Sequence, residues 1–155
     1  MTFKFAHSNE GQPPLRIPAI GLELSVRLPP ASTAGALTVI DTVNAPGFGP
    51  PLHRHRQTEI FRVLAGRYLF ETDGQRFYAE TGDVVTVPAG AVHAFVNVTD
   101  APARQMVLIM PALDAEKFFT ALGEIMRDGV PDRELLNAFG RRWEMEFLGA
   151  PLKAA

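Results

Sequence analysis

Three of the four histidines in this 155-residue chain belong to one regular pattern, which constrains the fold more than any other feature. Its two parts read Gly47-x5-His53-x-His55-x3-Glu59-x6-Gly66 and Gly82-x5-Pro88-x-Gly90-x2-His93-x3-Asn97. Side chains two residues apart on a β-strand project from the same face, so His53 and His55 would lie side by side. Glu59 has the same parity, and a second strand must bring His93 alongside. The pattern therefore predicts strands that turn sharply at the glycines and at Pro88.

The rest of the chain is divided into short segments by thirteen glycines and thirteen prolines, which is typical of strands joined by turns. Prolines also interrupt the first thirty residues, so we expect only an edge strand there, at 20–28. Asp73-Gly74 favours a tight two-residue hairpin turn. Further strands are predicted at 36–43, 59–65, 67–72, 75–80, 84–87, 93–98 and 104–110. Strands of this length and spacing predict an all-β fold, a closed or nearly closed antiparallel barrel.

After Pro111 the hydrophobic spacing becomes helical. Asp114 is placed to cap one helix, and Asp132 is placed to cap a second, shorter one. Amphipathic helices usually bury one face, so these helices are expected to cover the outside of the barrel. The alternative is a lid over the barrel mouth, for which the candidate apolar residues are Phe118, Phe119, Phe139, Trp143 and Phe147.

Length and composition favour one domain, 1–155, with an N-terminal extension and edge strand at 1–35, the barrel core at 36–111 and a helical segment at 112–155. The chain has no cysteine, which excludes disulfides, thiolate metal ligands and a cysteine nucleophile. Its net charge of −2, with acidic and basic residues interspersed, predicts no nucleic-acid or anionic-membrane partner. The first residues lack the apolar region of a signal peptide, and no apolar run approaches the roughly 18 residues that span a bilayer. We therefore expect a cytoplasmic protein.

Three imidazoles and one carboxylate form a mixed nitrogen and oxygen ligand set. His53, His55, Glu59 and His93 are the predicted ligands of one divalent metal, namely Fe, Mn, Ni, Co, Cu or Zn. An octahedral ion would keep two positions open for chemistry, whereas a tetrahedral zinc would be saturated. Arg54 and Arg56 have the opposite parity and are expected to point outward. Asn97 is expected to order the neighbouring backbone.

The pattern resembles the two-part signature of the cupins, and all ten fixed positions match. Chance agreement at ten positions is on the order of 10⁻¹³, at about one in twenty per position. The resemblance implies a cupin-type jelly-roll barrel with one or two C-terminal helices, one bound divalent metal and a homodimer. The helical segment after the barrel is similar to that of small single-domain cupins of the quercetin-dioxygenase-like group.

The expected surroundings of the metal are apolar, because parity directs Phe61, Val63 and Phe95 inward as pocket-lining candidates. Such a pocket suits a small aromatic or phenolic ligand that presents an oxygen to the metal. The leading hypothesis is therefore a metal-dependent oxygenase in which Glu59 also exchanges protons. Two alternatives stay open: a non-catalytic small-ligand-binding or sensory barrel, and a non-oxidative metal-assisted isomerase or decarboxylase.

Overall fold

The computed structural model describes residues 3–7 and 13–154, and these are dominated by antiparallel β-strands. The strands are β1 (Leu15–Ile17), β2 (Leu22–Leu28), β3 (Thr38–Asn44), β4 (Pro51–His55), β5 (Thr58–Ala65), β6 (Arg67–Thr72), β7 (Gln75–Glu80), β8 (Val84–Val87), β9 (His93–Asn97), β10 (Ala103–Met110) and β11 (Met145–Pro151). The helices are α1 (Ala115–Ile125) and α2 (Arg133–Gly140), with short 3₁₀ turns η1 (Pro18–Ile20), η2 (Pro30–Thr33) and η3 (Arg141–Trp143). The expected strands and both expected helices are therefore present, with small shifts at their ends.

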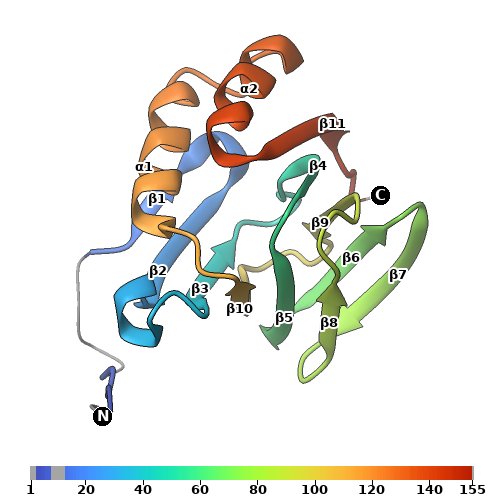
Figure 1. The fold of residues 1–155 in the computed structure, drawn as a ribbon. Coiled ribbons are helices and arrows are strands. Elements are labelled where there is room, and N and C mark those ends of the chain that lie inside the picture. The colour runs from blue at the N-terminus through green and yellow to red at the C-terminus, as the bar shows by residue number, and fades with distance from the viewer. Residues whose placement is uncertain (1–2, 8–12, 155) are drawn as a thin grey trace.

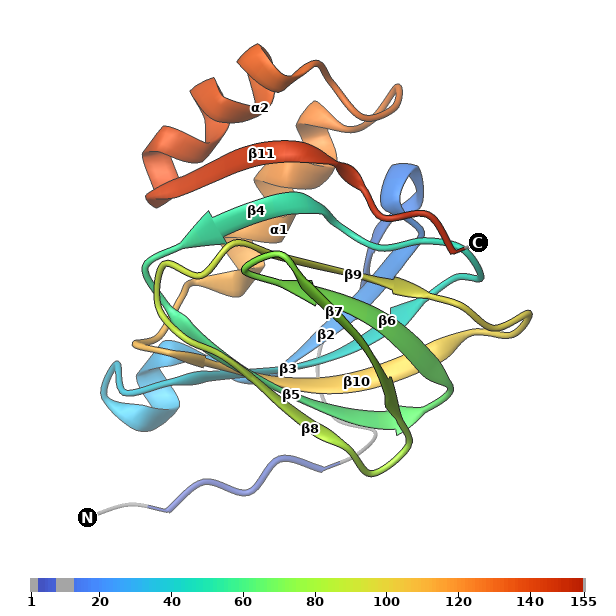
Figure 2. The ribbon, with the colours of Figure 1, turned by 90° about the vertical axis from the view of Figure 1, so that its right-hand side faces the viewer.

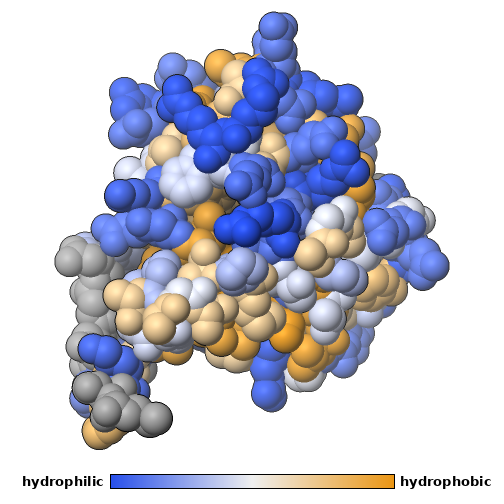
Figure 3. Space-filling view, viewed as in Figure 1, coloured by the Kyte–Doolittle hydropathy of each residue, from blue (hydrophilic) through white to orange (hydrophobic). Residues whose placement is uncertain are grey.

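Two sheets face each other and enclose the core. One has the order β1-β2-β3-β10-β5-β8 and the other the order β11-β4-β9-β6-β7 (Figure 1). Consecutive strands often lie in different sheets, as β4 and β5 do, and this alternation confirms the predicted jelly-roll arrangement. The helices lie beside β1 and β11 at one end of the molecule (Figure 2). On the face shown in Figure 3, hydrophobic side chains are visible near the middle, between hydrophilic ones.

Local sequence signals account for the turns and helix starts. Asp73 and Gly74 have φ angles of 48° and 80°, the left-handed conformation that a tight hairpin turn requires, and they join β6 to β7. The Asp114 side chain accepts a hydrogen bond from the Lys117 N–H, and Asp132 accepts one from the Leu135 N–H. Both aspartates thus cap the helices that they were predicted to begin.

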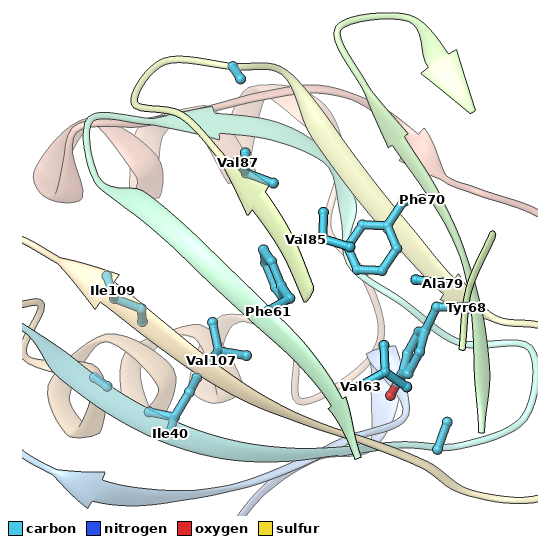
Figure 4. Packing of buried hydrophobic residues seen from close by; sticks show 13 residues of the cluster. Ile40, Phe61, Val63, Tyr68, Phe70, Ala79, Val85, Val87, Val107 and Ile109 are labelled. Atoms are coloured by element: carbon cyan, nitrogen blue, oxygen red, sulfur yellow. The ribbon is translucent and has the colours of Figure 1, made fainter. Parts of the chain in front are cut away.

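The barrel core consists of side chains that alternate along the strands and point between the sheets. Figure 4 shows Phe61 and Val107 among them, with Val63 beside the Tyr68 ring. A second cluster, formed by the inner faces of both helices, η1 and Phe147, lies next to the barrel. Each buried Leu, Ile or Phe in these clusters contributes about 1.5–3 kcal/mol of burial free energy.

The segment 112–155 was predicted to be helical, and for its last part this prediction is wrong. Met145–Pro151 forms strand β11, which pairs with β4 at the edge of the second sheet. The Asn137 side chain joins the two parts, because it donates to the Phe147 carbonyl and accepts from the Phe147 N–H. Pairing with a strand about ninety residues away, not local periodicity, makes this segment a strand.

No helix in the described part of the chain is long and apolar enough to cross a membrane.

Candidate metal centre

Four side chains converge at one end of the barrel. His53 and His55 come from β4, Glu59 from β5 and His93 from the first residue of β9. The β4–β9 pairing places His53 directly opposite His93, and their ring centroids are 4.3 Å apart. One donor atom from each of the four residues lies within 4.8 Å of the others. The structure therefore brings together all four residues predicted as ligands.

Backbone carbonyls set the orientation of all three imidazoles. The Nδ1 atoms of His53, His55 and His93 lie 2.6, 3.1 and 2.9 Å from the carbonyl oxygens of Pro51, Gln57 and Ala91. A carbonyl oxygen only accepts, so each Nδ1 must carry the proton. In the neutral ring this leaves the lone pair on Nε2, the tautomer that metal ligation through Nε2 requires.

The Nε2 atoms meet the carboxylate of Glu59. Oε1 of Glu59 contacts Nε2 of His55 and lies 3.3 Å from Nε2 of His93. Two acceptors cannot approach in this way unless a proton or a cation lies between them. The cluster is therefore a site where a positive charge must be shared, and a divalent metal meets that requirement as well as a proton does.

The pKa values follow from burial and from this contact. Burial, assisted by the nearby His93 and His55, lowers the pKa of His53 from 6.5 to about 3. Burial alone would raise the pKa of Glu59, but hydrogen bonds from His55 and His93 outweigh it and hold that pKa well below its ordinary value. Burial also opposes protonation of His55, yet the hydrogen bond and charge of Glu59 raise its pKa above 6.5. At neutral pH the cluster thus holds an ionised carboxylate and a neutral His53, a donor set suited to a cation.

The neighbouring polar residues behave as their parity predicted. Arg54 and Arg56 are exposed, and they pair with Glu146 and Glu144 at 2.7 and 2.8 Å. Asn97 is fully buried and orders the backbone, donating to the carbonyls of Asn44 and Ala101 at 3.0 and 2.8 Å. None of these three residues belongs to the cluster.

The cluster forms part of the wall of a cavity of about 110 Å³. Of the three predicted pocket-lining residues, Phe61 and Phe95 line it, whereas Val63 does not. Val63 is fully buried in the barrel core. Its side chain packs in that core beside the Tyr68 ring (Figure 4).

The helical end of the chain lines the same cavity. Phe118, Phe119, Leu122 and Met126 of the α1 region line it, together with Trp143, Met145 and Phe147. Phe139 instead packs into the second hydrophobic cluster. The expectation that the helices bury one face is met, since α1 fills a second core. Its residues also form part of the cavity wall, and a lid role stays a prediction.

Sequence reasoning missed several cavity residues, two of them beside the cluster. One is Met145, which lies opposite His55 in the β11–β4 pairing. The other is Gln57, which is 5% exposed and lines the cavity beside the cluster. Its parity, the same as that of His55 and Glu59, was a signal that could have identified it.

Comparisons with known proteins agree with this geometry. Residues 42–109 match the family model described as the cupin domain, the stretch that carries the whole cluster. The chain is 34% identical over 127 residues to germin-like protein 2-4 of Oryza sativa subsp. japonica, covering 74% of this chain and 53% of that protein. It is 34% identical over 95 residues to quercetin 2,3-dioxygenase of Bacillus subtilis (strain 168), covering 60% of this chain and 27% of that protein.

The chain thus spans about half of the first relative and about a quarter of the second. In fold it is similar to the solved structure of KdgF from Halomonas sp., with a TM-score of 0.65 at 19% identity over 74% of this chain and 99% of that one. The signature, the two facing sheets and the converging ligand set agree with these matches. The chain belongs to the cupin superfamily.

Proposed function

We propose that this protein is a metal-dependent enzyme, an oxygenase that acts on a small aromatic or phenolic compound. The observation that carries the proposal is the position of the His53–His55–Glu59–His93 cluster in the wall of an otherwise largely apolar cavity. A ligand in that cavity would have its apolar body against Phe61, Phe95 and Val107 and its oxygen at the cluster.

The four residues of the cluster would hold the metal, since the Nδ1 hydrogen bonds already direct the imidazoles' Nε2 atoms toward an ionised Glu59. Three neutral imidazoles and one carboxylate leave a net charge near +1 with a divalent ion, which favours an anionic substrate oxygen. When bound, the ion would acidify a coordinating hydroxyl group and, if redox-active, exchange electrons with dioxygen. The candidate ions are Fe, Mn, Ni, Co, Cu and Zn, and measurement of the metal content identifies which one is bound.

Glu59 is the proposed proton acceptor. Its lowered pKa makes it a weak base, so it would take a proton only from a hydroxyl group that the site has made acidic. No other Asp, Glu, Lys, Arg or Tyr occurs among the described residues that line the cavity. Reactions that need a separate general acid and base, such as many isomerisations, therefore fit this site less well than oxidation does.

The cavity volume supports a single-ring substrate. An apolar cavity of about 150 Å³ accommodates one benzene molecule, and the cavity here has about 110 Å³. A ring with one or two small substituents fits after minor side-chain rearrangement, whereas a multi-ring flavonol would require the α1 wall to move.

Glu59 is the only Asp, Glu, Lys, Arg or Tyr among the described residues that line the cavity, and this lack of further catalytic groups favours a second candidate. That candidate is a ligand-binding barrel without turnover. Its pocket and metal would be identical, so only the fate of the ligand separates the two. Unchanged ligand recovered after prolonged incubation with the metal-loaded protein and dioxygen would favour the binding protein.

The first experiment measures metal content by plasma mass spectrometry on untagged protein, beside His55→Ala and the exposed control Arg54→Ala. We expect about one equivalent of metal in the wild type and in Arg54→Ala, and little in His55→Ala. Oxygen uptake with single-ring phenols then tests turnover. A wild type that binds no metal, even after reconstitution with each candidate ion, would overturn the proposal.

A further inference from the structure

We infer that Gln57 is a specificity residue, whose side-chain amide binds a second polar atom of the ligand next to the oxygen held at the cluster. The inference rests on the proposed function, because it assigns a recognition role within the same site. It predicts that the preferred ligand carries two adjacent oxygen functions, as a catechol does.

The position of Gln57 is fixed relative to the cluster. It lies in the bend between β4 and β5, two residues from His55 and two from Glu59. Its carbonyl oxygen accepts the hydrogen bond from Nδ1 of His55 at 3.1 Å, so its backbone is part of the scaffold that orients a ligand residue. Its two chain neighbours are more exposed, whereas Gln57 itself is only 5% exposed.

The Gln57 amide has no hydrogen-bond partner in the part of the chain that the structure describes. Apart from the cluster and the Trp143 indole, the polar side chains lining the cavity are those of Thr42, Asn44 and Gln57. The Thr42 hydroxyl donates to the Gln105 carbonyl at 3.4 Å, and Asn44 accepts from the Tyr68 hydroxyl at 2.9 Å. For Gln57, the structure shows no side-chain hydrogen bond to any described residue. The Gln57 amide is not among the fully buried polar atoms that lack a partner, so it keeps access to solvent-sized space. Because the residue lines the cavity, its amide is free to bond to what occupies the cavity.

Distance along the barrel separates Gln57 from the other two polar residues. Strand β10 lies between β3 and β5 and pairs with both. Its Ile109 has Thr38 of β3 on one side and Glu59 of β5 on the other, and its Gln105 has Thr42 and Val63 in the same way. Thr42 is therefore about four residues, or 13 Å, along the barrel from the level of Glu59, and Asn44 is further still. Among the three, Gln57 is thus the residue within reach of a group adjacent to the oxygen at the cluster.

The chemistry of an amide suits this role. Its NH₂ group donates and its carbonyl oxygen accepts, so it can bind a neighbouring hydroxyl group in either sense without changing its charge. Phe61, Phe95 and Phe147, which also line the cavity, offer no competing side-chain hydrogen bond. A ligand with one oxygen satisfies the cluster but leaves the Gln57 amide unpaired, at a cost in affinity.

The experiment compares catechol with phenol on the zinc-loaded protein without oxygen, so that binding is measured apart from turnover. Trp143 is the single tryptophan of the chain and lines the cavity, so quenching of its fluorescence reports ligand entry. We expect the wild type to bind catechol about tenfold more tightly than phenol, the scale of one well-made hydrogen bond.

Gln57→Leu keeps the side-chain size and removes both polar atoms. It should bind the two compounds equally, because catechol loses a hydrogen bond and phenol no longer leaves an amide unpaired. The zinc content should stay unchanged, and the exposed control Gln75→Leu should keep the wild-type ratio. Gln57→Met serves as a second apolar variant if Gln57→Leu folds poorly.

A Gln57→Leu protein that keeps the wild-type preference for catechol would overturn the inference and leave the proposed function intact. Equal loss of both affinities together with loss of zinc would show a structural role and would also overturn it. If neither compound quenches Trp143 in the zinc-loaded wild type, the proposed small phenolic ligand fails as well.

Discussion

Phe147 lies directly opposite His53 in the pairing of β11 with β4, and the centroids of their rings are 6.1 Å apart. The C-terminal strand thus forms one wall of the cavity beside an imidazole of the cluster. Gly140 lies close behind this strand, because a Cβ atom added there would come within 2.4 Å of the Met145 carbonyl oxygen. The end of α2 and the start of β11 are therefore closely packed, and this packing holds the wall in place.

Glu59→Gln should weaken metal binding by at least tenfold. The amide keeps the shape of the side chain but removes its negative charge, and with it the main attraction for a cation in the cluster. Calorimetric titration with Zn(II) measures the change. The control is Glu80→Gln, since Glu80 is exposed and pairs with Arg67; equal affinities in the wild type and Glu59→Gln would contradict the prediction.

The metal-free protein should become less stable as the pH falls from 6.5 towards 3. The folded state holds the pKa of His53 at about 3, so below 6.5 the unfolded chain takes up a proton that the folded protein does not. This lowers the free energy of unfolding by up to about 1.4 kcal/mol per pH unit. Glu59 also contributes, because its pKa in the folded protein is lowered from the ordinary value of 4.5. Below pH 4.5 its contribution to the free energy of unfolding is therefore progressively lost as well.

His55 acts in the opposite sense. Its raised pKa gives a stabilising contribution that is full below 6.5 and is lost as the pH rises through the folded value. Urea unfolding of the chelator-treated wild type and of His53→Gln, at pH 7 and pH 5, separates the two effects. A wild type whose pH dependence matches that of His53→Gln would argue against a neutral buried His53.

Gly49→Ala should destabilise the fold by several kcal/mol. A Cβ atom at this position would lie 1.7 Å from the Phe95 carbonyl oxygen, so the approach to β4 or strand β9 would have to move. Gly123→Ala is the matched control, because its added Cβ makes ordinary contact with Ile17 at 3.6 Å inside α1. That variant should gain up to about 1 kcal/mol from helix propensity. Thermal unfolding measures both, and a stable Gly49→Ala would contradict the close approach.

Leu122→Phe should reduce phenol affinity without loss of metal. Leu122 is buried on α1 and lines the cavity, so the larger ring would occupy part of the space a ligand needs. Leu135→Phe is the control, because Leu135 is 52% exposed on α2. Trp143 fluorescence titration gives the affinities; an unchanged affinity in Leu122→Phe would place the ligand elsewhere.

The predicted homodimer stays a prediction, and light scattering tests it. We expect the mass of two chains, since β1 and β8 are edge strands of their sheet and Val84 on β8 is 60% exposed. A Val84→Lys variant that changes dimer to monomer would locate the contact at this edge. The mass of one chain at micromolar concentration would contradict the prediction.

The sequence alone determined which residues form the cluster, where most strands lie and where the helices begin. Each of these features depends on local rules: the two-residue period of a strand, the left-handed turn at Asp73-Gly74, and the capping by Asp114 and Asp132. Parity also placed Arg54 and Arg56 outside. The cupin fold was identified from the same ten residues.

Tertiary structure decided what surrounds the cluster. Parity assigns a side chain to a face of the sheet but does not say which neighbours cover it, so it could not separate Phe61, which lines the cavity, from Val63, which does not. Strand β11 forms only because β4 offers it a partner, and Phe147 reaches His53 by that long-range pairing. The pairing register of the strands brings residues together that are distant in the sequence. The cavity, its wall and the role inferred for Gln57 depend on those contacts, so they can be recognised only in the folded chain.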